Sequence, residues 1–140
     1  MPAEYFIANS NEVTNLKNFE DLFALMQRYE NFGGISDFQA VYSLSRLFFQ
    51  DEKHIPKDIH KHLADSSKIY LFGEDFVTKI ASFDREEMNS LASMWREDEY
   101  WKAKNYFGMG IWSDLYELYD LCKIALRENK NLNLVDESNG

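Results

Sequence analysis

The sequence predicts a mainly α-helical protein, a compact bundle of about five to seven helices with a short two-stranded β ribbon formed by the terminal segments. Only two prolines and six glycines interrupt the 140 residues, too few for the frequent turns of a β sandwich or barrel. Several segments repeat apolar residues at helical spacing, and the apolar segments nearest the two ends are typical of strands. The length favours a single domain, residues 1–140.

The N-terminal third predicts one strand and then one helix. Residues 5–8 form a short apolar run of strand-forming residues that ends in polar residues. A helix is expected over residues 18–31, because four apolar residues at helical spacing fall on one face: Phe19, Leu22, Phe23 and Met26. Gly33 and the next glycine are expected to end that helix, since glycine accepts a left-handed conformation.

The middle of the chain predicts two further helices and a loop or short strand. Ser36 and Gln39 have the spacing of a capping box, which predicts a helix from there to about Gln50. Pro56 suits the first turn of a short helix over residues 56–65. A loop or short strand is expected between Ser67 and Gly73, where β-forming residues are bracketed by turn formers.

The C-terminal half predicts three helices and a strand. One short helix is expected over residues 74–82, and another begins at a capping-box-like start, Asp84 and Glu87, and continues to Lys104. The last helix is expected to begin at Ser113 as N-cap, because a clean apolar stripe follows it. Residues 131–134 alternate Asn and Leu, the period-two pattern of a strand.

Two glycines one residue apart, Gly108 and Gly110, raise the possibility of a phosphate-binding loop. The segment has neither the third glycine of a dinucleotide-binding loop nor the lysine of a P-loop. Asp114 and Glu117 would place negative charge in the first helical turn, where a phosphate would have to lie. The segment is therefore interpreted as a hinge between two helices.

The net charge is −9 and the pI is about 4.8. This argues against nucleic acid and against an anionic membrane surface, which both need a basic face. It fits a basic partner, or a role in solubility alone. One cysteine excludes an intramolecular disulfide, and the N-terminus has no basic and apolar pattern of a signal peptide, so a cytoplasmic location is expected.

Two features of the sequence are candidates for chemistry. Asp58, His62 and Asp65 would share one helical face and could hold a metal or support acid–base work; the alternative is a solvated ladder of charges. Cys122 lies in an apolar stripe and is expected to act as a small hydrophobic side chain rather than a nucleophile. No catalytic residue and no cofactor is predicted.

The acidic residues are unevenly distributed. Residues 84–120 contain nine acidic and four basic residues, a net charge of −5, and aromatic residues lie among them. Exposed acids around aromatic anchors are typical of a surface that binds a basic protein; the alternative is the solvated side of ordinary amphipathic helices. The candidate partner-binding residues are Glu97, Asp98, Glu99, Tyr100, Trp101, Tyr106, Trp112, Asp114, Glu117 and Asp120.

These observations favour a non-enzymatic acidic binding protein that engages a basic protein partner. In general character (small, acidic and aromatic-rich) the chain is similar to bacterial immunity proteins and antitoxins, which neutralise basic toxins. That likeness of type implies a toxin domain as the partner. The alternatives are a structural or adaptor protein that self-associates as a homo-oligomer, and a metal-dependent or acid–base enzyme that uses the histidine segment.

Overall fold

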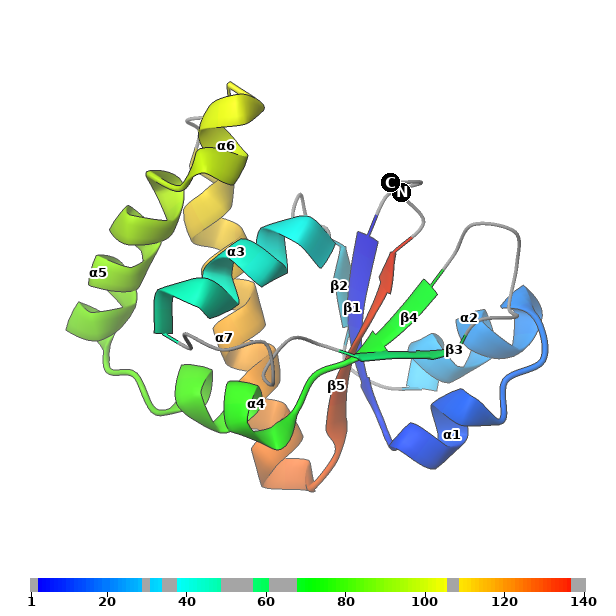
Figure 1. Ribbon diagram of the computed structural model, residues 1–140. Coiled ribbons are helices and arrows are strands. Elements are labelled where there is room, and N and C mark those ends of the chain that lie inside the picture. The colour runs from blue at the N-terminus through cyan, green and yellow to red at the C-terminus, as the bar shows by residue number, and fades with distance from the viewer. Residues whose placement is uncertain are drawn as a thin grey trace.

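The computed structural model describes residues 3–28, 31–33, 38–48, 57–60, 68–105 and 109–136. The protein is mainly helical, as predicted, and its helices cover both faces of one antiparallel sheet (Figure 1). Two helices, α1 and α2, lie on one face, and α3 to α7 lie on the other. The result is three layers with the sheet in the middle.

The described part of the chain contains seven helices. Their bounds are α1 (Ser10–Thr14), α2 (Phe19–Arg28), α3 (Phe38–Phe48), α4 (Glu74–Ala81), α5 (Arg85–Arg96), α6 (Glu99–Ala103) and α7 (Gly110–Glu128). Helix α7 is the longest of them and packs against the sheet and against α4 and α5. It ends where Asn129 adopts a left-handed conformation, φ 55°, which caps the helix C-terminus.

The strands are β1 (Ala3–Ala8), β2 (Asn31–Gly33), β3 (Lys57–His60), β4 (Lys68–Leu71) and β5 (Asn131–Asp136). The first and last of them pair antiparallel along their whole length, from Ala3 opposite Asp136 to Ala8 opposite Asn131, so the predicted terminal pair is confirmed. The sheet extends beyond that pair on both sides, in the order β2-β1-β5-β4-β3. Both terminal strands are therefore interior strands of the sheet.

Side chains along the interior strands alternate between the two faces of the sheet, and each face has its own hydrophobic core. Tyr5 and Ile7 of β1 enter the larger core under α3 to α7, whereas Phe6 and Ala8 enter the smaller core under α1 and α2. On β5, Leu132 and Leu134 face the larger core. Since successive strand residues point to opposite faces, one strand sequence serves both layers.

Two element predictions in the first half are wrong. Within the expected helix 56–65, Lys57–His60 is a strand paired with β4, and the remaining positions lie outside the described residues. Gly33 does not end a helix, because α2 ends at Arg28 and Asn31–Gly33 pairs with β1. In both places pairing with a neighbouring strand prevails over local pattern.

The second half confirms most of its predicted elements. The Asp84 start of α5 is a true capping box, with the Glu87 N–H donating to Asp84 Oδ1 over 2.8 Å and the Asp84 N–H donating to Glu87 Oε1 over 3.0 Å. The helix does not continue to Lys104, because the chain turns at residues 97–98 and begins α6. Ser113 is not the N-cap of α7, which already begins at Gly110.

Candidate functional site

The described candidate partner-binding residues differ in burial: four acids are exposed, Asp98, Tyr100 and Trp112 are half-buried, and two are buried. Of the acidic ones, Glu97, Glu99, Glu117 and Asp120 are exposed on α5, α6 and α7, and Glu86 on α5 is exposed as well. We call these five residues the acidic surface. They lie on the helical layer that is separated from α1 and α2 by the sheet (Figure 1).

Two acidic residues in the turn between α5 and α6 contact neighbouring residues of the same turn. Glu97 is the C-cap of α5, and its carboxylate lies 3.5 Å from Lys102 Nζ. The Tyr100 N–H donates to Asp98 Oδ2 over 2.9 Å, so this carboxylate caps α6. Glu99, in the first turn of α6, is left exposed. The side chain of Asp98 therefore has a structural role, whereas that of Glu99 points to solvent.

Two of the candidate partner-binding residues are core residues, which corrects their assignment. Trp101 is 2% exposed and packs edge-to-face on Trp95, with ring centroids 5.5 Å apart. Asp114 is 7% exposed, so it is not at the surface either. Trp112 is half-buried, and within the described part of the chain its indole nitrogen has no acceptor. Tyr106 lies outside the described residues.

Tyr116 and Tyr119 on α7 are half-buried aromatic residues in the same helical layer that the candidate partner-binding residues do not include. Both are half-buried beside the exposed Glu117 and Asp120. The Tyr116 hydroxyl donates to Asn89 Oδ1 of α5 over 2.6 Å. Tyr116 and Asp120 are four residues apart and therefore share one helical face, a spacing that could have identified Tyr116.

The lysines near the acidic surface lie over tyrosine rings or beside Glu97. Lys104 Nζ lies 4.8 Å from the centroid of Tyr100, and Lys123 Nζ lies 4.7 Å from that of Tyr119. Within the described part of the chain, the side chains of four of the five acidic-surface residues take no part in any ion pair or hydrogen bond: Glu86, Glu99, Glu117 and Asp120. These four carboxylates therefore have no ion-pair partner within the described residues.

The candidate metal group is not assembled by the described residues. Asp58 lies in strand β3, so the helical face on which the grouping depended does not exist at that position, and His62 and Asp65 lie outside the described residues. Within residues 3–28, 31–33, 38–48, 57–60, 68–105 and 109–136, no three His, Cys, Asp or Glu side chains are grouped to hold a metal ion.

Cys122 lies in the larger core on α7 and is completely buried. Burial raises the pKa of its thiol well above the ordinary range, because the thiolate would have to form without water. A raised pKa removes the thiolate, which is the nucleophilic form of cysteine. The structure agrees with a packing role for this side chain.

We expect the native protein to react with a thiol reagent such as Ellman's reagent at least about 100-fold more slowly than the urea-unfolded chain, because reaction requires opening of the core. The measurement is the absorbance time course at neutral pH with and without urea. One thiol per chain should be titrated in urea. Rapid stoichiometric labelling of the native protein would contradict the burial of Cys122.

A cleft of about 190 Å³ lies where the first turn of α4 meets the end of α7. Its lining includes Phe72 and Glu74 on one side and Leu126, Asn129 and Lys130 on the other. Pockets that bind drug-sized ligands are larger, roughly 300–1,000 Å³. The cleft also lies at the opposite end of α7 from the α5–α6 turn (Figure 1).

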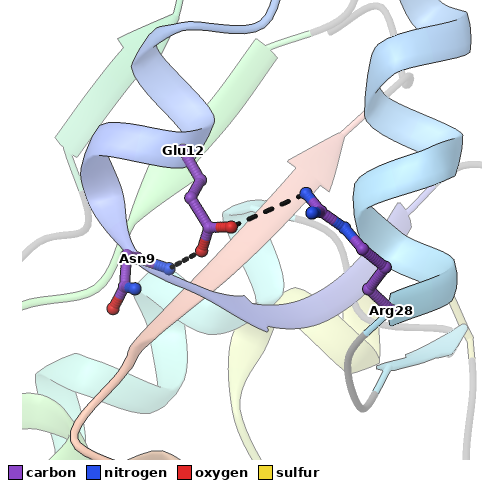
Figure 2. Close-up of polar contacts among 3 residues, drawn as sticks. All are labelled: Asn9, Glu12 and Arg28. Carbon is purple, nitrogen blue, oxygen red and sulfur yellow. Dashed lines mark hydrogen bonds and ion pairs between the residues drawn. The ribbon is translucent and has the colours of Figure 1, made fainter.

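The layer of α1 and α2 carries its own polar contact (Figure 2). Glu12 accepts a hydrogen bond from the Asn9 N–H over 3.1 Å and lies 3.6 Å from the Arg28 guanidinium. The contact fixes the start of α1 and joins α1 to the end of α2. The Arg28 side chain is 63% exposed, and exposed ion pairs contribute only about 0–1 kcal/mol. We regard this contact as structural.

No helix in the part of the chain that the structure describes is both long and apolar enough to cross a membrane.

No protein-family model matches the chain, and the searches of curated proteins and of solved structures also found no match.

Proposed function

We propose that the protein is a non-enzymatic binding protein that engages a basic protein partner through the acidic surface on α5, α6 and α7. The observation that supports this most is the group of exposed carboxylates that form no ion pair within the described residues. Glu86, Glu99, Glu117 and Asp120 lack ion pairs within the described residues, while the nearby lysines lie over tyrosine rings or beside Glu97. Such a surface raises the association rate of a positively charged partner.

Half-buried tyrosines supply the second ingredient of a binding surface. Tyr116 and Tyr119 lie among the acids on α7, and their hydroxyl groups are held by hydrogen bonds to Asn89 and to the Phe83 carbonyl. Tyrosine is enriched in protein interfaces because a rigid ring buries much apolar area at a low entropy cost. The charges would steer the partner, and the rings would retain it.

The proposed partner class is a basic toxin domain, with the protein acting as a bacterial immunity protein or antitoxin in the cytoplasm. Toxins that act on nucleic acids carry basic faces, and an acidic inhibitor complements such a face. The general character of the chain, together with the position of its acids, supports this partner class over nucleic acid or an anionic membrane. A tagged pull-down from the native host at low salt, repeated at high salt, tests the proposal: one basic protein released by salt is expected.

Reversal of one charge on the acidic surface should slow association with that partner. We expect Glu117→Lys to lower the association rate constant about 3- to 10-fold at low salt and to flatten its salt dependence, because steering is lost. Glu20→Lys is the matched control, since Glu20 is exposed on α2 in the opposite layer and changes the net charge equally. Stopped-flow fluorescence measures both rates. If both variants slow association equally, the partner does not bind through the acidic surface.

Self-association is the rival function, and exposed methionines support it. Met94 on α5 is 52% exposed and Met109, next to the start of α7, is 72% exposed. Exposed apolar side chains of this size occur at interfaces between proteins. Light scattering at micromolar concentration discriminates between the two functions: a monomer is expected from the basic-partner proposal, and a defined oligomer would favour self-association.

A further inference from the structure

We propose that Arg96 of α5 and Trp112 of α7 together bind a carboxylate that the basic partner carries; we call these two residues the carboxylate site. This inference rests on the proposed function and adds a contact of a different chemistry to it. The Arg96 Nε and Trp112 Nε1 atoms are both buried, and neither has a hydrogen-bond acceptor within the described residues. Buried N–H groups are nearly always paired in folded proteins, so these two donors point to an acceptor from outside the chain.

Helix geometry places Arg96 and Trp112 on the same side of the contact between α5 and α7. The Tyr116 hydroxyl of α7 donates to Asn89 Oδ1 of α5, which fixes where the two helices meet. Arg96 comes seven residues after Asn89, so these two share one face of α5. Trp112 comes four residues before Tyr116, so these two share one face of α7.

The two residues also lie at similar heights along the two helices. Tyr119, one turn after Tyr116, donates to the carbonyl of Phe83, which precedes α5, so the helices run antiparallel. The start of α7 therefore lies toward the end of α5, where Arg96 is. Helical side chains lean toward the N-terminus of their own helix, which brings the side chains of Arg96 and Trp112 toward each other.

A carboxylate suits these donors better than a neutral acceptor does. The Nε–H and one terminal N–H of a guanidinium group point the same way and donate two parallel hydrogen bonds to the two oxygens of a carboxylate. The indole N–H of Trp112 can only donate, so it adds a third bond to the same oxygens. Within the described residues no carboxylate forms an ion pair with Arg96. An incoming carboxylate would therefore supply both the missing acceptor and the counter-charge.

The surroundings favour a carboxylate that belongs to a basic polypeptide. Glu86, three residues before Asn89 on α5, and Asp120, four residues after Tyr116 on α7, are both exposed along the same helix contact. These acids and the net charge of −9 repel a free anion. A carboxylate that is presented among lysine or arginine residues is attracted instead, because its neighbours are complementary to the acids. The source is therefore expected to be a protein segment rather than a small carboxylic acid.

Nuclear magnetic resonance of isotope-labelled protein tests the site, because the Trp112 indole N–H and the Arg96 Nε–H give separate cross-peaks. The probes are acetyl-Lys-Lys-Glu-Lys-Lys-amide (the Glu peptide), the same peptide with Gln in place of Glu (the Gln peptide), and sodium acetate. We expect the Glu peptide to shift both cross-peaks with one dissociation constant, about 5- to 20-fold lower than that of the Gln peptide. Acetate should shift the same two cross-peaks, with a dissociation constant at least about 5-fold higher than that of the Glu peptide.

Two charge-matched variants separate the site from general electrostatics. Arg96→Gln should weaken the Glu peptide about 5- to 20-fold, to the level of the Gln peptide. Arg127→Gln removes the same charge from an exposed position near the end of α7 and should leave the affinity unchanged or slightly raised. Loss of a positive charge alone would strengthen the binding of a basic peptide, so the two variants are expected to differ in direction.

Trp112→Phe keeps an aromatic ring and removes only the indole donor. We expect it to weaken the Glu peptide about 2- to 5-fold and to leave the Gln peptide unchanged. Circular dichroism establishes that each variant is folded. If Arg96→Gln does not fold, the comparison of Trp112→Phe with the native protein decides the question.

The outcomes distinguish this inference from the proposed function. If neither cross-peak moves, or if Arg96→Gln behaves as Arg127→Gln does, water alone pairs these donors and the site is overturned. If acetate binds as tightly as the Glu peptide, the polypeptide source is overturned. If the site fails while only Glu117→Lys slows the natural partner, the acidic surface stands without it. If the peptide results hold while Glu117→Lys and Glu20→Lys act equally, the proposed function fails and the site binds a carboxylate of another partner.

Discussion

Trp95→Ala is expected to lower the free energy of unfolding by about 3–5 kcal/mol, the usual cost of deleting a buried aromatic side chain. Trp95 is completely buried on α5, and its ring packs edge-to-face on Trp101 of α6. Its indole N–H donates to the Ala40 carbonyl over 3.2 Å and to Ser43 Oγ over 3.0 Å, both on α3. Since one side chain joins three helices, its loss is a large part of a typical stability of about 5–15 kcal/mol.

Urea unfolding followed by circular dichroism measures this change. Trp95→Phe retains an aromatic ring but removes the N–H donor, so a smaller loss of about 1–3 kcal/mol is expected. Met94→Ala, at the neighbouring exposed position, is the control and should change stability by less than about 1 kcal/mol. A Trp95→Ala protein as stable as Met94→Ala would contradict the packing of α3, α5 and α6 around this ring.

The second large effect is expected at the centre of the sheet. Leu134 is completely buried on β5 and faces the larger core, with Tyr5 opposite it on β1 and Tyr70 opposite it on β4. Leu134→Ala removes apolar contact area and leaves a cavity between strands that are fixed on both sides. We expect a loss of about 3–5 kcal/mol, because an interior strand cannot collapse to fill the cavity.

Leu126→Ala is a matched control, because it makes the same chemical change at a position that is 42% exposed. Leu126 lies near the end of α7, where alanine is an equally good helix former, so a change below about 1 kcal/mol is expected. The midpoint of urea unfolding should fall strongly for Leu134→Ala alone. Similar shifts for the two variants would contradict the central position of β5.

The elements that the sequence predicted well are those with a strong local signal. The apolar stripe of α7 and the capping box at Asp84 depend only on neighbours three and four residues away. Strands β2 and β3 have no such signal, because they are short edge strands that depend on pairing with β1 and β4 rather than on contacts three and four residues away. Pro56 suits the first turn of a helix, so a helix was predicted there. In the structure Lys57–His60 is a strand that pairs with β4.

The candidate site was predicted in part, for a related reason. The excess of acids on residues 84–120 follows from composition, and Glu97, Glu99, Glu117 and Asp120 are exposed. Which aromatic residues turn inward depends on helix phase and on the packing partner, and Trp101 packs on Trp95 in the core. The sequence predicted one continuous helix to Lys104. The chain instead breaks at Asp98 between α5 and α6, and this break changes which side chains of α6 face the core.

The position of β5 also dictates the order in which the nascent chain can complete its fold. Ala8 and Asn133, which contact each other in the sheet, are 125 positions apart. Before β5 emerges from the ribosome, β1 with β2 and β4 with β3 can form only two separate ribbons, each with an open edge. Strand β5, which follows the other four described strands in the chain, pairs with one edge of each ribbon. A chain that stalls before Asn131 therefore leaves the β5-facing edges of β1 and β4 unpaired. Such unpaired backbone groups favour chaperone binding or aggregation.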